Sequence, residues 1–114
     1  MPISVHHVGI PAADPARSEQ FWATLLGGAV EHRFGHAVIS TDDGAVQIAV
    51  VPRRPDDPPG HAHGAHLCLA APESERAALL ARLAALGAPS EEVRGRLYAR
   101  DPDGYTLEFQ FVRG

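Results

Sequence analysis

Hydrophobic and polar residues follow two different periods along the first part of the chain. Residues 3–11 have the apolar, β-branched composition of a strand, and residues 15–26 repeat apolar side chains at helical spacing. Asp14 followed by Pro15 predicts the N-cap and the first position of this helix, and the two glycines at 27–28 predict its end. The apolar face of the helix is expected to consist of Phe21, Trp22, Leu25 and Leu26.

The same order of elements returns in the second half of the chain. Three short strand-like runs follow the first helix, at about residues 29–34, 36–41 and 45–51. A strand at 66–70 then precedes a second helix at 74–86, which Gly87 ends. Three more runs complete the chain, at about residues 91–94, 96–100 and 105–112. Each half is therefore predicted to contain a strand, a helix and three further strands.

Residue correspondences between the halves indicate an internal repeat. One constant shift of the sequence aligns His7 with His66, Asp14 with Glu73, Arg17 with Arg76 and Gly28 with Gly87. Identity between the halves is low, but the shared order of elements is harder to obtain by chance. We therefore predict an α+β fold of two βαβββ modules, neither of which can bury its own sheet face. Together they are expected to form a cupped mixed sheet around one site, with the helices on its outer face.

A stretch rich in proline and glycine separates the two modules. Residues 52–64, PRRPDDPPGHAHG, hold four prolines and two glycines, which exclude regular secondary structure. We predict one domain over residues 1–114, with module 1 at about 1–51, this linker, and module 2 at about 65–114.

The composition limits the classes of function. Apolar residues make up 45% of the 114 residues, enough for a core, and no apolar run approaches the length of a membrane span. The N-terminus lacks the features of a signal peptide, so we expect a cytoplasmic protein with no membrane partner. The net charge is -4 and the basic residues form no stripe, so no nucleic-acid partner is expected. The single cysteine, Cys68, excludes an intrachain disulfide and a Cys-rich zinc site, whereas seven histidines make a metal worth testing.

Four predicted strands each place one metal-capable side chain opposite an apolar face. Side chains alternate between the two faces of a strand, so Glu108 faces away from its neighbours Leu107 and Phe109, which would pack on a helix. A carboxylate among apolar neighbours is costly unless it is paired or binds a metal. In three other predicted strands a metal-capable side chain likewise lies opposite the apolar face. The complete set is His7, Gln47, His66 and Glu108.

Two imidazoles, one amide and one carboxylate suit one divalent metal ion, if the four strands line one concave surface. Imidazole and carboxylate bind nickel, cobalt, manganese, iron or zinc, and an amide oxygen favours the harder ions among them. Four protein ligands leave room for water or a chelating substrate. The remaining positive charge of such a site would stabilise an enolate or another oxyanion on the substrate.

The turn Asp101-Pro102-Asp103-Gly104 supports the register of the last strand. Proline presets the second position of a turn, and glycine supplies the positive φ that ends it. A fixed turn determines which residues of the following strand share a face. A slip of one residue would send Glu108 to the apolar side.

The chain resembles the vicinal oxygen chelate superfamily, also called the glyoxalase/bleomycin-resistance/dioxygenase family, over nearly all of its length. The segments that carry this resemblance are HHVGIPAADPARSEQFWATLLGG, AVQIAVV, HLCLAAPESERAALLARLAALGAP and RDPDGYTLEFQ. The last segment is the most specific, because a DPDG turn precedes a strand with an inward Glu.

The resemblance implies that His7, Gln47, His66 and Glu108 occupy the four metal-ligand positions of the family. This set is similar to that of methylmalonyl-CoA epimerase, and glyoxalase I uses closely similar sets. The resemblance also implies one divalent metal ion, a small-molecule ligand and a homodimer, with a site that in some members combines residues of two chains. The expected activity is that of a lyase or isomerase/epimerase acting on a small oxygen-chelating substrate through an enolate-type intermediate. Glu108 would then combine metal ligation with catalytic proton transfer.

Two other functions stay open from the sequence. A non-catalytic protein that sequesters a metabolite or an antibiotic would need no metal. A metal-dependent thiol transferase, as in fosfomycin resistance, would share three of the four ligands, although its cation-binding loop and substrate-binding residues are not found here.

Individual residues also leave alternatives. His6 is the alternative ligand to His7, and His36 is either an ordinary strand residue or part of the pocket. Cys68 is expected to line the pocket or the core and not to act as a nucleophile, because no base is evident beside it. Three residues that share one strand parity are expected on the surface, with contact to an anionic substrate as the alternative: Arg96, Tyr98 and Arg100.

Overall fold

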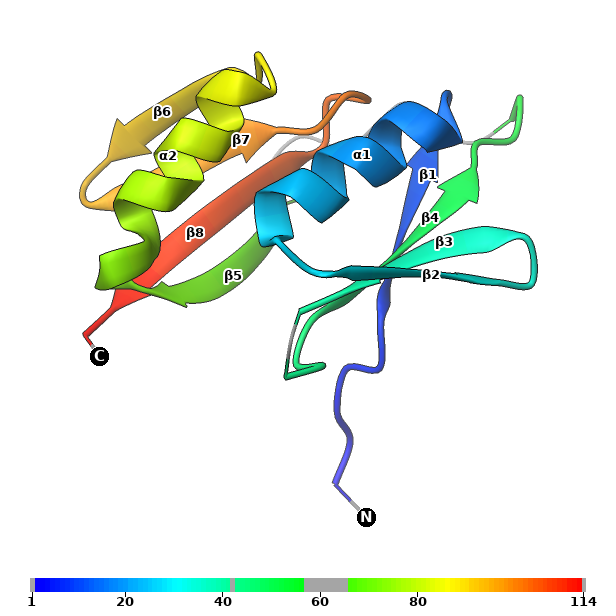
Figure 1. Cartoon of the computed structure of the whole chain (residues 1–114), viewed down its shortest axis with the longest axis horizontal. Helices are drawn as coiled ribbons and strands as arrows, with labels where there is room; N and C mark the ends of the chain where they lie inside the picture. Colours follow the sequence, from blue (N-terminus) through cyan, green and yellow to red (C-terminus); the bar gives the residue numbers. More distant parts are fainter. Residues whose placement is uncertain (1, 42, 57–65, 114) are drawn as a thin grey trace. The chain divides into compact units, whose positions relative to one another are not determined.

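The computed structural model describes residues 2–41, 43–56 and 66–113. The chain divides into two compact units, residues 1–57 and residues 58–114, and each is described by itself (Figure 1). Each unit holds one four-stranded mixed sheet with a helix on one face. No helix of the described residues is long and apolar enough to cross a membrane.

The first unit contains one helix and four strands. Strand β1 precedes helix α1, and an antiparallel meander of three strands follows the helix. The sheet order is β1-β4-β3-β2, because β1 pairs in parallel with β4. The elements are β1 (Val8–Ala12), α1 (Pro15–Leu26), β2 (Ala29–Arg33), β3 (His36–Ser40) and β4 (Gln47–Pro52).

The second unit repeats this topology. Strand β5 pairs in parallel with β8, and the sheet order is β5-β8-β7-β6. The elements are β5 (Leu67–Pro72), a single 3₁₀ turn η1 (Glu73–Glu75), α2 (Arg76–Ala85), β6 (Ser90–Val93), β7 (Arg96–Arg100) and β8 (Thr106–Val112). The predicted α+β fold of two βαβββ modules is therefore confirmed.

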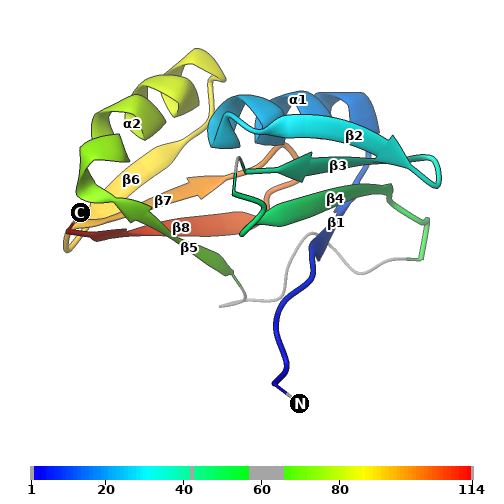
Figure 2. The same ribbon diagram turned by 60° about the horizontal axis from the view of Figure 1, so that its bottom comes forward.

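Helix α1 begins and ends where the local sequence predicts. The Asp14 side chain accepts a hydrogen bond from the backbone N–H of Arg17 at 3.3 Å, and Pro15 occupies the first turn. Gly27 ends the helix with a φ of 63°, in the left-handed region that glycine adopts at little cost. The buried face of the helix packs on the sheet in Figure 2 and consists of Ser18, Phe21, Trp22 and Leu25.

Apolar side chains of alternating parity form the core of each unit. In the first unit, fully buried Ile39 and Ile48 are cross-strand partners on the side of α1. In the second unit, Leu97 on β7 pairs with Phe109 on β8, and both are buried together with the Leu83 side chain of α2. Figure 2 shows α2 lying along one face of this sheet, as α1 does in its own unit.

The first strand is shorter than the sequence predicts. Strand β1 begins at Val8, and residues 2–7 have no regular secondary structure. Strand β1 lies at the sheet edge, and its neighbour β4 begins only at Gln47, so the residues before His7 have no partner strand. Of the predicted linker, Pro52 is the last residue of β4 and residues 57–64 lie outside the described residues, so its bounds stay a prediction.

Both modules use the same hairpin turn, which the sequence analysis did not identify. The turn between β2 and β3 has positive φ at Phe34 (53°) and Gly35 (79°), and the turn between β6 and β7 has it at Arg94 (52°) and Gly95 (81°). Two consecutive residues of positive φ define the tight hairpin turn whose twist matches that of the strands. Phe34 and Arg94 are unusual at such positions, because side chains with a Cβ seldom adopt a positive φ.

A close backbone approach at Gly28 predicts a large effect of substitution. A Cβ atom there would lie 2.0 Å from the carbonyl oxygen of Ser40, so the chain between α1 and β2 would have to move. We expect Gly28→Ala to lower the free energy of unfolding by about 2 to 3 kcal/mol, measured by urea denaturation. Gly9→Ala is the matched control, because a Cβ at Gly9 has nothing within 4 Å. Equal stability of the two variants would contradict this account.

Candidate functional site

The sheet of the second unit has one apolar face and one polar face. Leu97, Leu107 and Phe109 alternate with the polar residues of β7 and β8 and are buried. Directly paired residues project to the same face, and one such row crosses all four strands. This row consists of Cys68 on β5, Glu108 on β8, Tyr98 on β7 and Glu91 on β6.

Glu108 is a buried carboxylate held between two basic side chains. Only 2% of the residue is exposed. Its Oε1 lies 3.2 Å from Nε2 of His66, and its Oε2 lies 3.2 Å from Nη1 of Arg96. The contact with Arg96 is an ion pair without hydrogen-bond geometry, so Oε2 accepts no hydrogen bond from the described residues. Burial of a charge is costly unless it is paired, and here the charge of Arg96 compensates Oε2 without a hydrogen bond.

The turn before β8 holds Glu108 on this face. Asp101 Oδ1 accepts hydrogen bonds from the backbone N–H groups of Asp103 and Tyr105, each at 2.9 Å. The N–H of Gly104 also donates to the carbonyl of Asp101 at 3.0 Å. These bonds close the turn that the DPDG sequence predicts, and they fix the register in which Glu108 opposes Tyr98.

The neighbouring thiol responds to the same carboxylate. Desolvation raises the pKa of Cys68, and the negative charge of Glu108 and a hydrogen bond with it raise that pKa further. The positive charge of Arg96 acts in the opposite direction. Because the thiolate is the reactive form, Cys68 is kept as a neutral thiol near neutral pH. Cys68 is exposed and Glu108 lies beside it, so the expectation that Cys68 is not a nucleophile stays a prediction.

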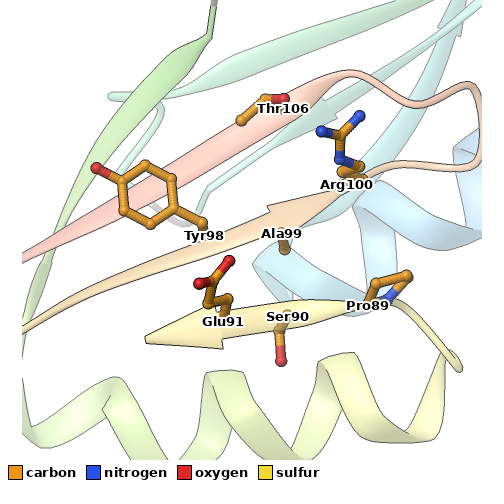
Figure 3. Close-up of a pocket in the computed structure, with 7 residues that line it drawn as sticks. All are labelled: Pro89, Ser90, Glu91, Tyr98, Ala99, Arg100 and Thr106. Carbon is orange, nitrogen blue, oxygen red and sulfur yellow. The ribbon is translucent and has the colours of Figure 1, made fainter. Parts of the chain in front are cut away.

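A pocket lies on the polar face of this unit, close to Glu108. It has a volume of about 290 Å³, and Glu91, Tyr98, Arg100 and Thr106 are among its lining residues. Figure 3 shows Arg100 and Thr106 extending to the same side of the sheet as Tyr98, whereas Ser90 points the opposite way. Arg100 and Thr106 are cross-strand partners. The pocket therefore begins one same-face position away from Glu108 along β8.

The first unit contains a pocket of about 180 Å³ lined by His7 and Gln47. Gln47 pairs with Ser40 and therefore faces away from α1, opposite to Ile48. Nδ1 of His6 lies 2.8 Å from Nδ1 of His7, so both imidazoles are at the pocket. Each remains a candidate ligand. The aromatic and basic side chains that share this pocket are Arg33, Phe34 and His36.

His36 adds a buried nitrogen to this pocket. Its Nδ1 is buried and makes no hydrogen bond with any described residue. The sequence left open whether His36 is ordinary or lines a pocket, and the structure places it in the pocket. Phe34 is 98% exposed at the tip of the adjacent hairpin. The pocket thus combines imidazole nitrogens with apolar surface.

The four ligands predicted from the sequence fall into two pairs, His7 with Gln47 and His66 with Glu108. Each pair belongs to one unit. Within residues 2–41, 43–56 and 66–113, no group of three or more His, Cys, Asp or Glu side chains is arranged to hold a metal ion. The second pair nevertheless fits a divalent metal chemically, because Oε2 of Glu108 is a buried anionic oxygen without a hydrogen-bond donor and an imidazole is adjacent.

Arg96 has a contact that the sequence did not predict. It is exposed, as expected of a surface residue, with 49% of its side chain accessible, and its guanidinium also forms an ion pair with Glu108. The alternation of side chains along β7 indicated that Arg96 and Tyr98 share a face. It did not indicate the register between β7 and β8, which places Arg96 diagonally across from Glu108.

A known protein family matches this chain over nearly its whole length. A family model described as "Glyoxalase/Bleomycin resistance protein/Dioxygenase superfamily" matches residues 4–109. No curated protein matches the chain in a sequence comparison.

Solved structures with the same fold are numerous, and three illustrate their range. Oxidase ChaP-H2 is 20% identical with a TM-score of 0.74, and the match covers 100% of this chain and 99% of that one. TnmS3, an antibiotic binding protein from Streptomyces sp. CB03234, is 20% identical with a TM-score of 0.75 and coverage of 97% and 98%. A variant of the fosfomycin resistance protein FosX from Listeria monocytogenes, complexed with Mn(II) and 1S,2S-dihydroxypropylphosphonic acid, is 16% identical with a TM-score of 0.75 and coverage of 96% and 90%. At these identities the similarity concerns the fold alone.

The charges around Cys68 predict how its reactivity depends on pH. Because its thiol pKa is raised, the rate of alkylation by iodoacetamide is expected to rise at a higher pH than for an unperturbed cysteine. Glu108→Gln removes a negative charge and is expected to shift the midpoint to lower pH. Arg96→Gln removes a positive charge and is expected to shift it to higher pH. Glu91→Gln is the control, since Glu91 is two strands further away. Shifts of the same sign in the two test variants would refute this assignment.

Proposed function

This chain belongs to the glyoxalase/bleomycin resistance protein/dioxygenase superfamily, and on that premise we propose that it is a divalent-metal-dependent lyase or isomerase, with epimerisation included. The proposed substrate is a small molecule with two neighbouring oxygen atoms. The proposed metal ligands are His7, Gln47, His66 and Glu108.

The observation that carries this proposal is the environment of Glu108. A carboxylate that is 98% buried on the polar face of its sheet is retained at an energetic cost. Its Oε2 accepts no hydrogen bond from the described residues, and the imidazole of His66 lies 3.2 Å from the other oxygen. A divalent cation could bind both groups, since carboxylate and neutral imidazole are common ligands of the same ions.

The first unit supplies donors of a compatible kind. His7 and Gln47 line one pocket, so an imidazole nitrogen and an amide oxygen are available there. With both pairs as ligands, the set has a single negative charge, and a divalent ion would keep a net positive charge. When bound, the ion would polarise a substrate carbonyl and stabilise negative charge on its oxygen. Similar structures include one of FosX complexed with Mn(II), which supports a divalent metal but does not identify it.

Glu108 is the proposed catalytic residue of the chain. One of its oxygens would accept the proton from the carbon next to the substrate carbonyl and return it to another position on the same face; an epimerisation would need a second proton donor on the other face. The proton and the electron pair are then both conserved, as an isomerisation or epimerisation requires. Glu108 itself is only 2% exposed, and its low contact with water favours proton transfer to the substrate.

A second candidate is a non-catalytic binding protein. The pocket of the first unit favours it, because Phe34, Val38 and Ala49 give that pocket an apolar surface suited to a drug-sized ring. TnmS3, with the same fold, is an antibiotic binding protein. The thiol transferase alternative has no comparable support in the described residues. For either leading function, a homodimer stays a prediction from the family resemblance.

Metal content tests the proposal directly. We expect protein purified without chelator to contain about one divalent transition metal ion per chain by elemental analysis, since the four proposed ligands would bind a single ion. His66→Ala is expected to lose most of this metal. His32→Ala is the matched control, because Nε2 of His32 lies 2.8 Å from Oε1 of Glu19 of α1, on the opposite face of its sheet.

Each outcome separates the two candidate functions. Metal lost in His66→Ala and kept in His32→Ala supports the enzyme and justifies a search among glyoxalase and epimerase substrates. Wild-type protein that contains no metal, and takes up none when nickel, cobalt, manganese or zinc is added, would exclude the enzyme and favour the binding protein.

A further inference from the structure

The ion pair between Arg96 and Glu108 presents a conflict with metal binding. Arg96 Nη1 lies 3.2 Å from Oε2 of Glu108, the oxygen that accepts no hydrogen bond. A guanidinium and a metal ion cannot both lie in contact with this oxygen without strong repulsion, since both are cations. If the carboxylate binds a metal, Arg96 has to move away.

The exposure of the two partners shows which one moves. The Glu108 side chain is 3% exposed and is fixed by its neighbours in β8, whereas the Arg96 side chain is 49% exposed. Arginine has a long flexible stem, so its head group can leave the carboxylate without a change in the backbone. Arg96 stands beside the β6–β7 turn at the first position of β7. The movable partner is therefore the cation.

A second arginine and a pocket lie on the same face, further along β7. Arg96, Tyr98 and Arg100 alternate along β7, and the pocket of about 290 Å³ in Figure 3 is lined by Tyr98, Arg100 and Thr106. No ion pair of Arg100 occurs among the described residues, so its charge is not neutralised. Once Glu108 is neutralised by a metal, this face would hold two arginines with Tyr98 between them, and Glu91 would be its remaining acidic group in the pocket.

We propose that Arg96 is an exchangeable counter-ion: it neutralises Glu108 while metal is absent, and after metal binding it joins Arg100 in holding an anionic group of the substrate. This inference rests on the proposed function and assigns the substrate class, a carboxylate, phosphonate or phosphate that also carries the two chelating oxygens. Arginine binds such planar or tetrahedral oxyanions through several parallel hydrogen bonds. Binding is then ordered, with the metal first and the anionic substrate second.

The affinity of the purified, metal-free protein for Mn²⁺ tests whether Arg96 competes with the metal for Glu108. Removal of the competing cation is expected to make Mn²⁺ binding by Arg96→Gln about tenfold tighter than in the wild type, measured by isothermal titration calorimetry. Arg100→Gln is the matched control, with the same charge removed from the same face of the same strand, and is expected to change the affinity less than about twofold. A merely structural role of Arg96 predicts the reverse, because a distorted site binds metal less tightly.

A wild-type measurement covers the case in which Arg96→Gln does not fold. The side-chain nitrogen-15 signals of Arg96 are expected to change in chemical shift when the metal-free protein is saturated with diamagnetic Zn²⁺, because the guanidinium then leaves the Glu108 carboxylate. An Arg96 signal that does not change on saturation with Zn²⁺ overturns the proposal. Weaker or unchanged Mn²⁺ binding in a folded Arg96→Gln variant overturns it as well.

Methylphosphonate is the probe for the anionic group. We expect it to bind Mn²⁺-loaded wild-type protein about tenfold more tightly than the equally loaded Arg96→Gln or Arg100→Gln protein, as loss of one charged hydrogen-bonding partner implies. Equal binding by the three loaded proteins overturns the assigned substrate class. Wild-type protein that binds no divalent metal defeats the proposed function and this inference together, whereas Mn²⁺ binding that is indifferent to Arg96 defeats the inference alone.

Discussion

Each four-stranded sheet in this protein has a single helix to cover it, and this constraint orders the rest of the structure. Only one face of a sheet can then exclude water against its helix, so apolar side chains must recur at every second position. Ile39 and Ile48 satisfy this requirement in the first unit, and Leu97 and Phe109 in the second. The alternate positions are released from packing on the helix. Polar groups and the pockets of both units occur at these positions.

Glu108 is the exception that gives the second unit its chemistry. It has the parity of a polar position but is as buried as the core, and its charge is tolerated because His66 and Arg96 stand beside it. The same charge raises the pKa of the Cys68 thiol and so suppresses its reactivity. One carboxylate thus contacts His66 and Arg96 and contributes to the raised pKa of Cys68. A group of this kind is costly to stability, and binding or catalysis is the usual reason for retaining it.

The repeat preserves architecture while the chemistry differs between the modules. Both units have the parallel pairing of the first and last strand and a hairpin turn with two consecutive positive φ angles. Backbone geometry imposes these features, so they recur with Phe34 in one turn and Arg94 in the other. Backbone geometry does not determine which side chains occupy the polar faces. One offers imidazole, amide and apolar surface, and the other offers a carboxylate with arginines and a tyrosine.

Local sequence signals determined the type and order of the elements, because capping and periodicity act within a few residues. Helix α1 spans Pro15–Leu26 as predicted, and the DPDG turn has the hydrogen bonds that its residues imply. The alternation of side chains along the last strand also identified Glu108 as an unusual carboxylate. Tertiary structure alone decided which strands are neighbours, where β1 begins, and that Arg96 pairs with Glu108. These outcomes depend on pairing between residues far apart in the chain, and the alternation within one strand carries no information about the register of the next.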